Sequence, residues 1–181
     1  MKKIPSDFTY SKYGLTVRLV KEDDAAFIVK LRTNKRLSRF IHETDDDVEK
    51  QKEWIREYKQ REKEGKDYYF IYFSGDRPVG VNRIYNITEE SSTGGSWVCS
   101  EDAKMEESLA TNFICTEICE MFDIPSGPYT VSKGNNQVLK FHLRMGSEII
   151  SEDDIEYVLK GNRDKYNKAK SRFVKLLFGE Q

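Results

Sequence analysis

Apolar and polar positions follow two different periods along this chain, and the period separates strands from helices. Residues 15–19 alternate, and residues 67–73 form an aromatic and β-branched run, both typical of strands. Apolar side chains recur at helical spacing over residues 105–122, and Gly65 is placed to end an earlier helix. The predicted elements are a strand at 15–19, helices at 23–32 and 44–64, strands at 67–73, 79–87 and 96–99, a helix at 105–122, a strand at 129–131, a helix at 135–146, strands at 148–150 and 155–159, and a basic C-terminal helix.

The helix after residues 129–131 carries the most specific pattern. Asn135 stands where a helix N-cap is expected, because its side-chain oxygen can accept from an otherwise unbonded N–H. Gly146 suits the left-handed residue that ends a helix. His142 follows Asn135 by seven residues, which is two helical turns, so it lies on roughly the same face as the cap.

This segment resembles the end of the GCN5-related N-acetyltransferase family, the acetyl-CoA-dependent amine acetyltransferases. The family pattern is Asn-x-x-Ala-x-x-x-Tyr-x-x-x-Gly, often closed by Phe, and the chain has Asn135, Val138, His142, Gly146 and Ser147 at these positions. Val138 and Ser147 depart from it. The resemblance implies that Asn135 helps to place coenzyme A. It also implies that His142 occupies the position of the tyrosine that protonates the departing thiolate.

The order of the predicted elements is also that of the family over residues 14–160. The resemblance therefore implies an acyl-CoA N-acyltransferase fold of the α+β (mixed α/β) class. Its central twisted sheet would be mostly antiparallel, with helices on both faces and a splayed parallel pair formed by residues 95–100 and 129–132. We expect a single domain over residues 1–181, with its core at about 14–160 and a C-terminal helix at about 161–178.

The family binds acetyl-CoA between the splayed strands, through backbone groups of the first one. Val98 and Ser100 are candidates for these contacts by position. The pyrophosphate normally meets an Arg/Gln-x-x-Gly-x-Gly/Ala loop at the start of the next helix, where backbone N–H groups and the helix dipole hold it. The corresponding stretch here, EDAKMEESLA, has no glycine and no arginine. Lys104 is its only cation and Ser108 a candidate hydroxyl donor, whereas two glutamates oppose a phosphate.

The acceptor is indicated by similarity to one subgroup. The phrases QKEWI and YYFI are similar to ribosomal-protein amine acetylases and nucleotide-aminosugar N-acetyltransferases, and FHLRMG is nearest the aminosugar side. The resemblance implies transfer of an acetyl group to a primary amine, most simply that of a nucleotide-linked amino sugar. Two alternatives stay open: acetylation of a protein N-terminal amine, and a catalytically silent fold used as a binding module, which the missing phosphate loop motivates.

Candidates for the acceptor side lie in residues 33–43 and in the hairpin. His42 is a base or substrate contact, or simply a solvated side chain. Glu101 accepts a proton through water, or is a surface carboxylate. Arginines 32, 36 and 39 meet a nucleotide diphosphate or solvate a helix end. Arg83 and Tyr85 share one strand face, which lines the acceptor cleft or packs against a helix.

Composition narrows the partners and the compartment. Of the 181 residues 34% are charged, and the net charge of -1 gives no general attraction to nucleic acid or an anionic membrane. The N-terminal segment lacks the apolar run of a signal peptide, and no apolar stretch approaches the ~20 residues of a membrane span. Three cysteines fit a reduced cytoplasmic protein, and Cys115 with Cys119 lacks the two further ligands of a zinc site, so no metal is predicted. A homodimer stays open.

Overall fold

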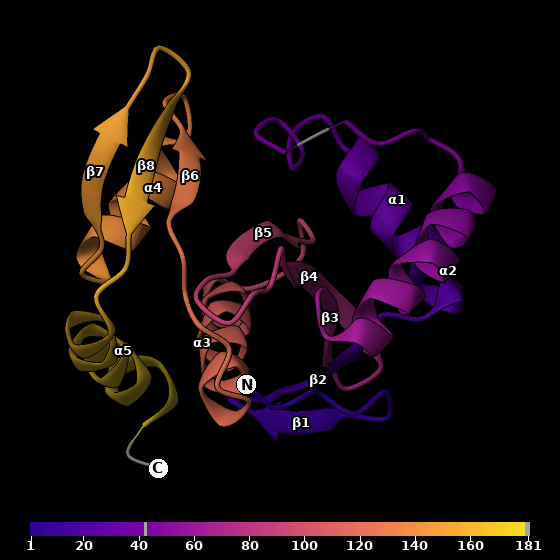
Figure 1. The fold of residues 1–181 in the computed structure, drawn as a ribbon, viewed down its shortest axis with the longest axis horizontal. Coiled ribbons are helices and arrows are strands. Elements are labelled where there is room, and N and C mark those ends of the chain that lie inside the picture. The colour runs from indigo at the N-terminus through magenta and orange to yellow at the C-terminus, as the bar shows by residue number, and fades with distance from the viewer. Residues whose placement is uncertain (42, 180–181) are drawn as a thin grey trace. The chain divides into compact units, whose positions relative to one another are not determined.

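A computed structural model describes residues 1–41 and 43–179 of the chain (Figure 1). The chain forms two compact units, Met1–Pro125 and Ser126–Gln181. The prediction of one domain over the whole chain stays a prediction. The predicted α+β class is confirmed, because helices and antiparallel sheets occur in both units.

The first unit is built on a five-stranded antiparallel sheet in the order β1-β2-β3-β4-β5. Its strands are β1 (Thr9–Lys12), β2 (Leu15–Leu19), β3 (Tyr68–Ser74), β4 (Arg77–Tyr85) and β5 (Thr93–Cys99). Its helices are the short η1 (Glu22–Asp24), α1 (Ala25–Thr33), α2 (Val48–Glu64) and α3 (Met105–Met121). All of the elements predicted between residues 15 and 122 are present, with shifts of a few residues at their ends.

Both faces of this sheet are covered, which explains why the first five residues of β3, Tyr68 to Tyr72, are all buried. Tyr69 and Ile71 lie in a core cluster with residues of α1 and α2. Phe70 and Tyr72 point to the opposite face because side chains alternate along a strand. There the ring of Tyr72 lies near Cys115 of α3. The central strand is thus buried on both sides, which a period of two would not reveal.

Helix α2 begins one turn later than the sequence predicted. Asp47 is its N-cap, and the Asp47 carboxylate accepts hydrogen bonds from the N–H groups of Glu49 and Lys50. The expected start at Thr44 is therefore wrong, because Thr44 is bonded to Arg32 instead. Gly65 ends the helix in the left-handed conformation at φ 78°, as predicted.

Strand β1 was not predicted, since its residues are polar and only half-buried. Side chains around the β1–β2 turn converge on Glu117 of α3. The hydroxyl of Tyr13 donates to Glu117 Oε1 at 2.7 Å, and Lys12 Nζ donates to the same oxygen at 3.1 Å. Burial and this carboxylate raise the pKa of Tyr13 to about 12, so the phenol stays a donor. A tertiary contact more than 100 residues away thus supports β1.

The second unit contains a three-stranded antiparallel sheet in the order β6-β8-β7 with two helices. Its elements are β6 (Tyr129–Ser132), α4 (Asn136–Arg144), β7 (Glu148–Glu152), β8 (Glu156–Lys160) and α5 (Arg163–Phe178). Gly146 follows α4 at φ 89°, as the motif predicted. Helix α5 approaches it so closely that an added Cβ would lie 2.3 Å from Cβ of Lys165. Gly146 therefore meets both a conformational and a steric requirement.

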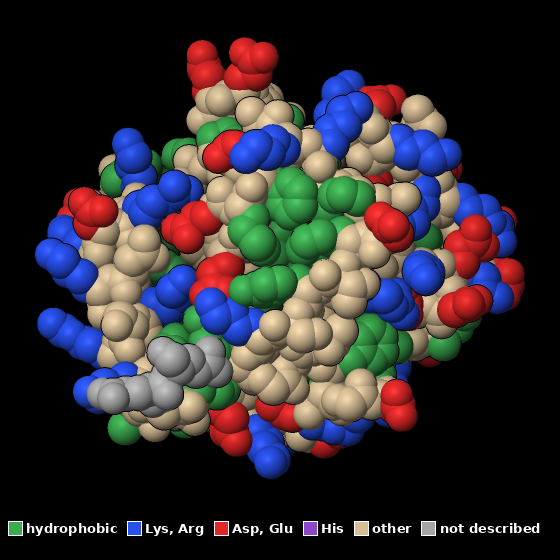
Figure 2. Space-filling view, turned by 90° about the horizontal axis from the view of Figure 1, so that it is seen from below, with side chains coloured by type: hydrophobic (Ala, Val, Ile, Leu, Met, Phe, Trp, Pro, Cys, Tyr) green, Lys and Arg blue, Asp and Glu red, His purple; other side chains and the backbone are tan. Residues whose placement is uncertain are grey.

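Charges of both signs are mixed on the surface. On the face drawn in Figure 2, Lys and Arg side chains alternate with Asp and Glu, in keeping with the net charge of -1. Among the helices that the structure describes, none has the length and apolar composition needed to cross a membrane. Within residues 1–41 and 43–179, no group of three or more His, Cys, Asp or Glu side chains is arranged to hold a metal ion.

Candidate functional site

Strand β5 is one of the two edge strands of the five-stranded sheet in the first unit. The N–H of Ser100 donates to the carbonyl of Val79 at 2.8 Å, and the register pairs Cys99 with Gly80 and Val98 with Val81. Hydrogen-bonded and non-bonded pairs alternate in an antiparallel ladder. Val98 and Ser100 thus turn their backbone groups toward β4, and Cys99 turns its own outward. The register favours Cys99 for backbone contacts at this edge, and the roles of Val98 and Ser100 stay predictions.

The middle of β5 is irregular. The pairing with β4 shifts between Val81 and Arg83, and Ser96 adopts a positive φ of 50°. Such a bulge re-aims backbone and side-chain groups. The hydroxyl of Ser96 accepts a hydrogen bond from Arg32 Nη1 at 3.1 Å, and Arg32 Nε donates to Thr44 Oγ1 at 2.5 Å. Arg32 therefore joins the end of α1, the following loop and the bulge.

At the start of α3, one of the two glutamates expected to oppose a phosphate is bonded within the protein. Glu107 Oε2 accepts from the backbone N–H of Lys104 at 2.9 Å, and Glu107 Oε1 accepts from Arg77 Nη2 at 2.6 Å. Burial opposes the charge on Glu107, but Arg77 and the Lys104 N–H outweigh it and lower its pKa. One of the two opposing carboxylates is thus neutralised by an arginine from β4, which sequence spacing could not show.

This helix start can receive an anion, although it lacks glycine. The N-cap residue, Lys104, forms a capping box with Glu107, whose carboxylate occupies the Lys104 N–H. The backbone N–H groups of a first helical turn have no intrahelical partner and carry the positive end of the dipole. The exposed Lys104 adds a cation. Ser108 is half-buried and close enough to the Cys99 thiol to lower its pKa, although burial raises that pKa overall. The roles of Lys104 and Ser108 stay predictions.

In the second unit, the motif residues form the expected capped helix. Asn135 is the N-cap of α4, and its side-chain oxygen accepts from Val138 N–H at 3.4 Å. That bond is long, so the amide group of Asn135 is held loosely. Its backbone N–H donates to Ser132 at the end of β6 at 2.8 Å. The predicted cap is therefore present, whereas its part in placing coenzyme A stays a prediction.

The ring of His142 packs between two aromatic side chains. Its centroid lies 4.7 Å from that of Tyr129 on β6 and 5.2 Å from that of Phe141. The Tyr129 hydroxyl is held 2.6 Å from Ser147 Oγ. Burial lowers the pKa of His142 to about 4, so its imidazole is neutral at pH 7. A solvated imidazole has a pKa near 6.5, and burial removes the charged form that a direct proton donor would use at pH 7.

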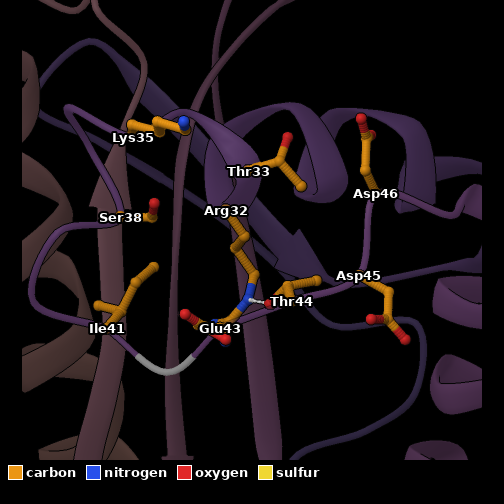
Figure 3. Close-up of a pocket in the computed structure, with 9 residues that line it drawn as sticks. All are labelled: Arg32, Thr33, Lys35, Ser38, Ile41, Glu43, Thr44, Asp45 and Asp46. Atoms are coloured by element: carbon orange, nitrogen blue, oxygen red, sulfur yellow. Dashed lines mark hydrogen bonds between the residues drawn. The ribbon is translucent and has the colours of Figure 1, made fainter.

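A cavity of about 440 Å³ lies beside the C-terminal end of α1 (Figure 3). Its lining is Arg32, Thr33, Lys35, Ser38, Ile41, Glu43, Thr44, Asp45 and Asp46. In Figure 3, Arg32 reaches toward Thr44 across it. Arg36 is exposed and lies 3.8 Å from Glu101, while Arg39 stacks on the Phe40 ring. Of the three arginines predicted to meet a diphosphate, only Arg32 lines this cavity. The candidate His42 lies outside the described residues.

A second cavity, of about 510 Å³, lies between the C-terminal end of α2 and the end of β4. Its lining is Arg61, Lys66, Asp67, Arg83, Tyr85, Asn86, Ile87 and Thr88. Arg83 and Tyr85 both line this cavity, and Arg83 also lies against the Trp54 ring of α2, so their place in an acceptor cleft stays a prediction. Arg61 and Asp67 were missed by the sequence analysis. An Asp directly before a buried aromatic strand is a weak signal, and nothing in the spacing connects it to Arg61.

Comparison with known proteins found similarity among solved structures only. No family model matches the sequence, and a search of curated proteins found no match. Among solved structures, the chain is similar to FdhC, described as a nucleotide-linked sugar GNAT, at 35% identity and a TM-score of 0.82, over 94% of this chain and 99% of that one. Ribosomal-protein-S5-alanine acetyltransferase from Vibrio fischeri is 18% identical, with a TM-score of 0.71 over 87% and 98%. Spermidine N-acetyltransferase from Vibrio cholerae, solved with CoA and spermine, is 13% identical, with a TM-score of 0.70 over 86% and 99%.

The chain therefore belongs to the GCN5-related N-acetyltransferase family. The class of enzyme and its co-substrate are those of the family, an N-acetyltransferase that uses acetyl-CoA. The predicted fold class is confirmed with it. The likenesses below 25% identity show the fold alone. The parallel pairing of residues 95–100 with 129–132, a cytoplasmic location and a homodimer stay predictions.

Proposed function

We propose that this chain acetylates a primary amine on a nucleotide-linked amino sugar. The observation that carries the proposal is the likeness to FdhC, which extends over 94% of the chain at 35% identity. The likeness to the ribosomal-protein enzyme reaches only 18% identity, and no feature of the described residues favours a protein N-terminus as the acceptor. The aminosugar is therefore the leading acceptor class.

In this proposal the first unit contributes two features to acetyl-CoA binding. The outward backbone groups of Cys99 pair with the amides of the pantetheine arm, and Val98 and Ser100 shape the same edge. Glu107 holds the N–H of Lys104, and the remaining backbone N–H groups of the first turn of α3 receive the pyrophosphate, with Lys104 supplying charge and Ser108 a hydroxyl. The ion pair between Arg77 and Glu107 supports this role, because it removes most of the repulsion that a free carboxylate would exert.

The second unit contributes Asn135 and His142. In the reaction the acceptor nitrogen attacks the thioester carbon, the carbon–sulfur bond breaks, one proton leaves the nitrogen, and one proton goes to the departing sulfur. His142 is neutral at pH 7, so it can take up a proton at one ring nitrogen while it releases one from the other. We assign it this relay, in place of the direct proton donation by a tyrosine that the family pattern implied.

Two measurements on the full-length chain test this proposal. Isothermal titration calorimetry should detect acetyl-CoA binding, and a well-folded protein that binds none would instead be a catalytically silent module. A panel of amines should then show acetylation of nucleotide-linked amino sugars with kcat/KM at least about 100-fold above that for a peptide N-terminus or spermidine. Preference for a peptide or a polyamine would overturn the acceptor assignment while leaving the acetyltransferase class intact.

A further inference from the structure

We infer that the cavity lined by Arg61, Asp67, Arg83 and Tyr85 binds the diphosphate and base of the acceptor nucleotide. This inference rests on the proposed function, because it assumes an acceptor that carries a nucleoside diphosphate. It adds a place for that group and names the side chains that hold it. The cavity, of about 510 Å³, is large enough for a small ligand.

A buried carboxylate fixes the two guanidinium groups in this cavity. Asp67 is 1% exposed and accepts from Arg83 Nε at 2.7 Å, from Arg83 Nη2, and from Arg61 Nε at 3.0 Å. Arg61 uses only Nε in this contact, and its two Nη groups bond to no described residue. Five N–H donors arranged as a rigid fork suit phosphate oxygens. Asp67 therefore pre-orients an anion-binding group.

The charges of the two cavities differ in sign. Three cationic residues and one acidic residue line the cavity with Arg61, whereas two cationic and three acidic residues line the cavity of Figure 3. A diphosphate is stabilised in the first and repelled by the carboxylates of the second. Arg32 is the candidate that the sequence proposed for this anion, but it lies in the acidic cavity. The balance of charge thus assigns the diphosphate to Arg61 and Arg83.

A nucleotide site must contact the base as well as the diphosphate, and aromatic rings can make that contact. The Arg83 guanidinium lies 4.9 Å from the Trp54 ring centroid and 4.7 Å from that of Tyr85. Tyr85 lies over Gly95, where an added Cβ would meet its ring at 2.9 Å. The missing side chain at Gly95 lets the Tyr85 ring lie against the sheet. Tyr85 is partly exposed and offers an aromatic contact to a nucleoside base.

The nucleotide cavity and the start of α3 lie at opposite ends of β5, so the two substrates can both lie along this strand. Tyr85 pairs with Thr93 at the start of β5, whereas α3 begins shortly after its end at Cys99. Seven residues of strand span roughly 23 Å. The Ser96 bulge lies between these two ends. A nucleotide at the first end and the acetyl-CoA pyrophosphate at the other would therefore not compete for the same groups.

Calorimetric titration of the full chain with UDP, dTDP and inorganic pyrophosphate tests the inference. We expect Arg61→Gln to weaken all three by about tenfold or more, because a charge-assisted fork to phosphate is lost. Arg61 is partly exposed and Asp67 keeps Arg83, so this variant should fold. Arg56→Gln is the matched control on the same helix, since Arg56 pairs with Glu22, and it should leave binding within twofold of wild type. Tyr85→Leu should weaken the two nucleotides but not pyrophosphate.

Three results would overturn the inference: no binding of any probe by folded wild type, equal binding by Arg61→Gln and wild type, or loss of UDP binding when CoA is saturating. Steady-state kinetics separates this failure from that of the proposed function. Acetylation of a nucleotide-linked amino sugar with an unchanged KM in Arg61→Gln would reject the cavity and keep the function. Arg61-dependent UDP binding without any such acetylation would reject the acceptor assignment and keep the cavity as a nucleotide site.

Discussion

The two units of this chain differ in how their polar groups are supported. In the first unit, buried acids have fixed partners: Asp24 is bonded to Arg18, Asp67 to Arg61 and Arg83, and Glu117 to the β1–β2 hairpin. In the second unit, neither α4 nor α5 contains a buried residue, and every residue of β7 is exposed. Val131, Met145 and Leu159 are the buried hydrophobic residues described there.

This difference predicts that substitutions of buried polar groups in the first unit cost more folding stability than substitutions of partly exposed motif residues in the second. The family motif from Asn135 to Gly146 lies in the second unit, which is lightly packed. The strongest polar networks lie in the first unit, with the five-stranded sheet. A partly exposed motif residue such as Asn135 can therefore be changed at small cost to folding, and a buried network residue such as Asp67 cannot. Substitutions in the two units should give different signatures, one in unfolding free energy and the other in kinetics.

The largest effect is expected at Asp67. Asp67→Ala removes the carboxylate that neutralises Arg83, a half-buried side chain, and leaves a charge without its partner. We expect the free energy of unfolding to fall by about 3–5 kcal/mol. Chemical denaturation monitored by circular dichroism measures it. Asp76→Ala, in the exposed β3–β4 turn, is the control and should change stability by less than about 0.5 kcal/mol. A small loss at Asp67 would contradict the proposed contrast between the units.

His142→Phe should affect turnover more than folding. The ring volume is kept against Tyr129 and Phe141, and the proton relay is lost, so kcat should fall by about 100-fold, the low end for such catalysis. Steady-state kinetics and the melting temperature are measured together. Phe141→Leu is a packing control on the same helix, expected to lower the melting temperature without a comparable loss of kcat. Normal turnover in His142→Phe would assign the ring to packing.

The same ring predicts a pH dependence of stability. The pKa of His142 is about 4 in the folded protein and about 6.5 when unfolded, so the unfolded chain binds more protons between these values. Stability is therefore full above about pH 6.5 and is lost as the pH falls toward 4. Wild type should lose roughly 1–3 kcal/mol more than His142→Phe over this range. Parallel losses in urea denaturation at pH 7 and 4.5 would contradict the half-buried, neutral ring.

Two asparagine caps in the second unit separate capping from acetyl-CoA binding. Asn135 and Asn162 cap α4 and α5 through bonds of 3.4 and 3.0 Å. Each Asn→Ala change should cost about 1 kcal/mol or less, and the longer bond at Asn135 should cost the smaller amount. Only Asn135→Ala should weaken acetyl-CoA binding in calorimetry, by about fivefold to tenfold. Equal affinities in the two variants would remove Asn135 from the acetyl-CoA site.

The smallest effect is expected at Lys104. Lys104→Glu should raise the KM for acetyl-CoA by a few-fold at low ionic strength and leave kcat nearly unchanged, because an exposed charge is screened by salt. Lys21→Glu makes the same charge change at the end of β2 and serves as the control. If the two variants have the same KM at low salt, Lys104 is not part of the pyrophosphate site.

Much of the fold was predictable from local pattern. The helical spacing of apolar residues predicted α3. Asn135 and Gly146 predicted the two ends of α4, because a helix cap depends on residues next to the helix end. Strand β1 was missed because its residues are polar; it pairs with β2 across the Tyr13–Gly14 turn, and Glu117, more than 100 residues away, adds side-chain bonds to it. The start of α2 was misplaced because Thr44 and Asp47 are both acceptable caps, and Arg32 occupies Thr44.

Only the site residues that lie at the spacing of the family motif could be predicted from the sequence. Asn135 and His142 follow from the motif, but the low pKa of His142 depends on Tyr129 packing against it. The neutralisation of Glu107 depends on Arg77, and the orientation of Arg83 depends on Asp67. Each is a contact between elements distant in sequence. In such a site, the charge and pKa of a side chain depend on contacts with elements distant in sequence. A sequence motif predicts only which positions the residues occupy.

Gly146 shows how one position can carry two independent demands. Its φ of 89° excludes ordinary L side chains by chirality, and the approach of Lys165 excludes them by crowding. These demands are chemically separable, because a D-alanine accepts the conformation and directs its methyl group away from the direction that an L residue would use. A semisynthetic chain with D-alanine at this site should keep α5 seated, whereas L-alanine should displace it. The end of the motif helix is thus defined by handedness as much as by size.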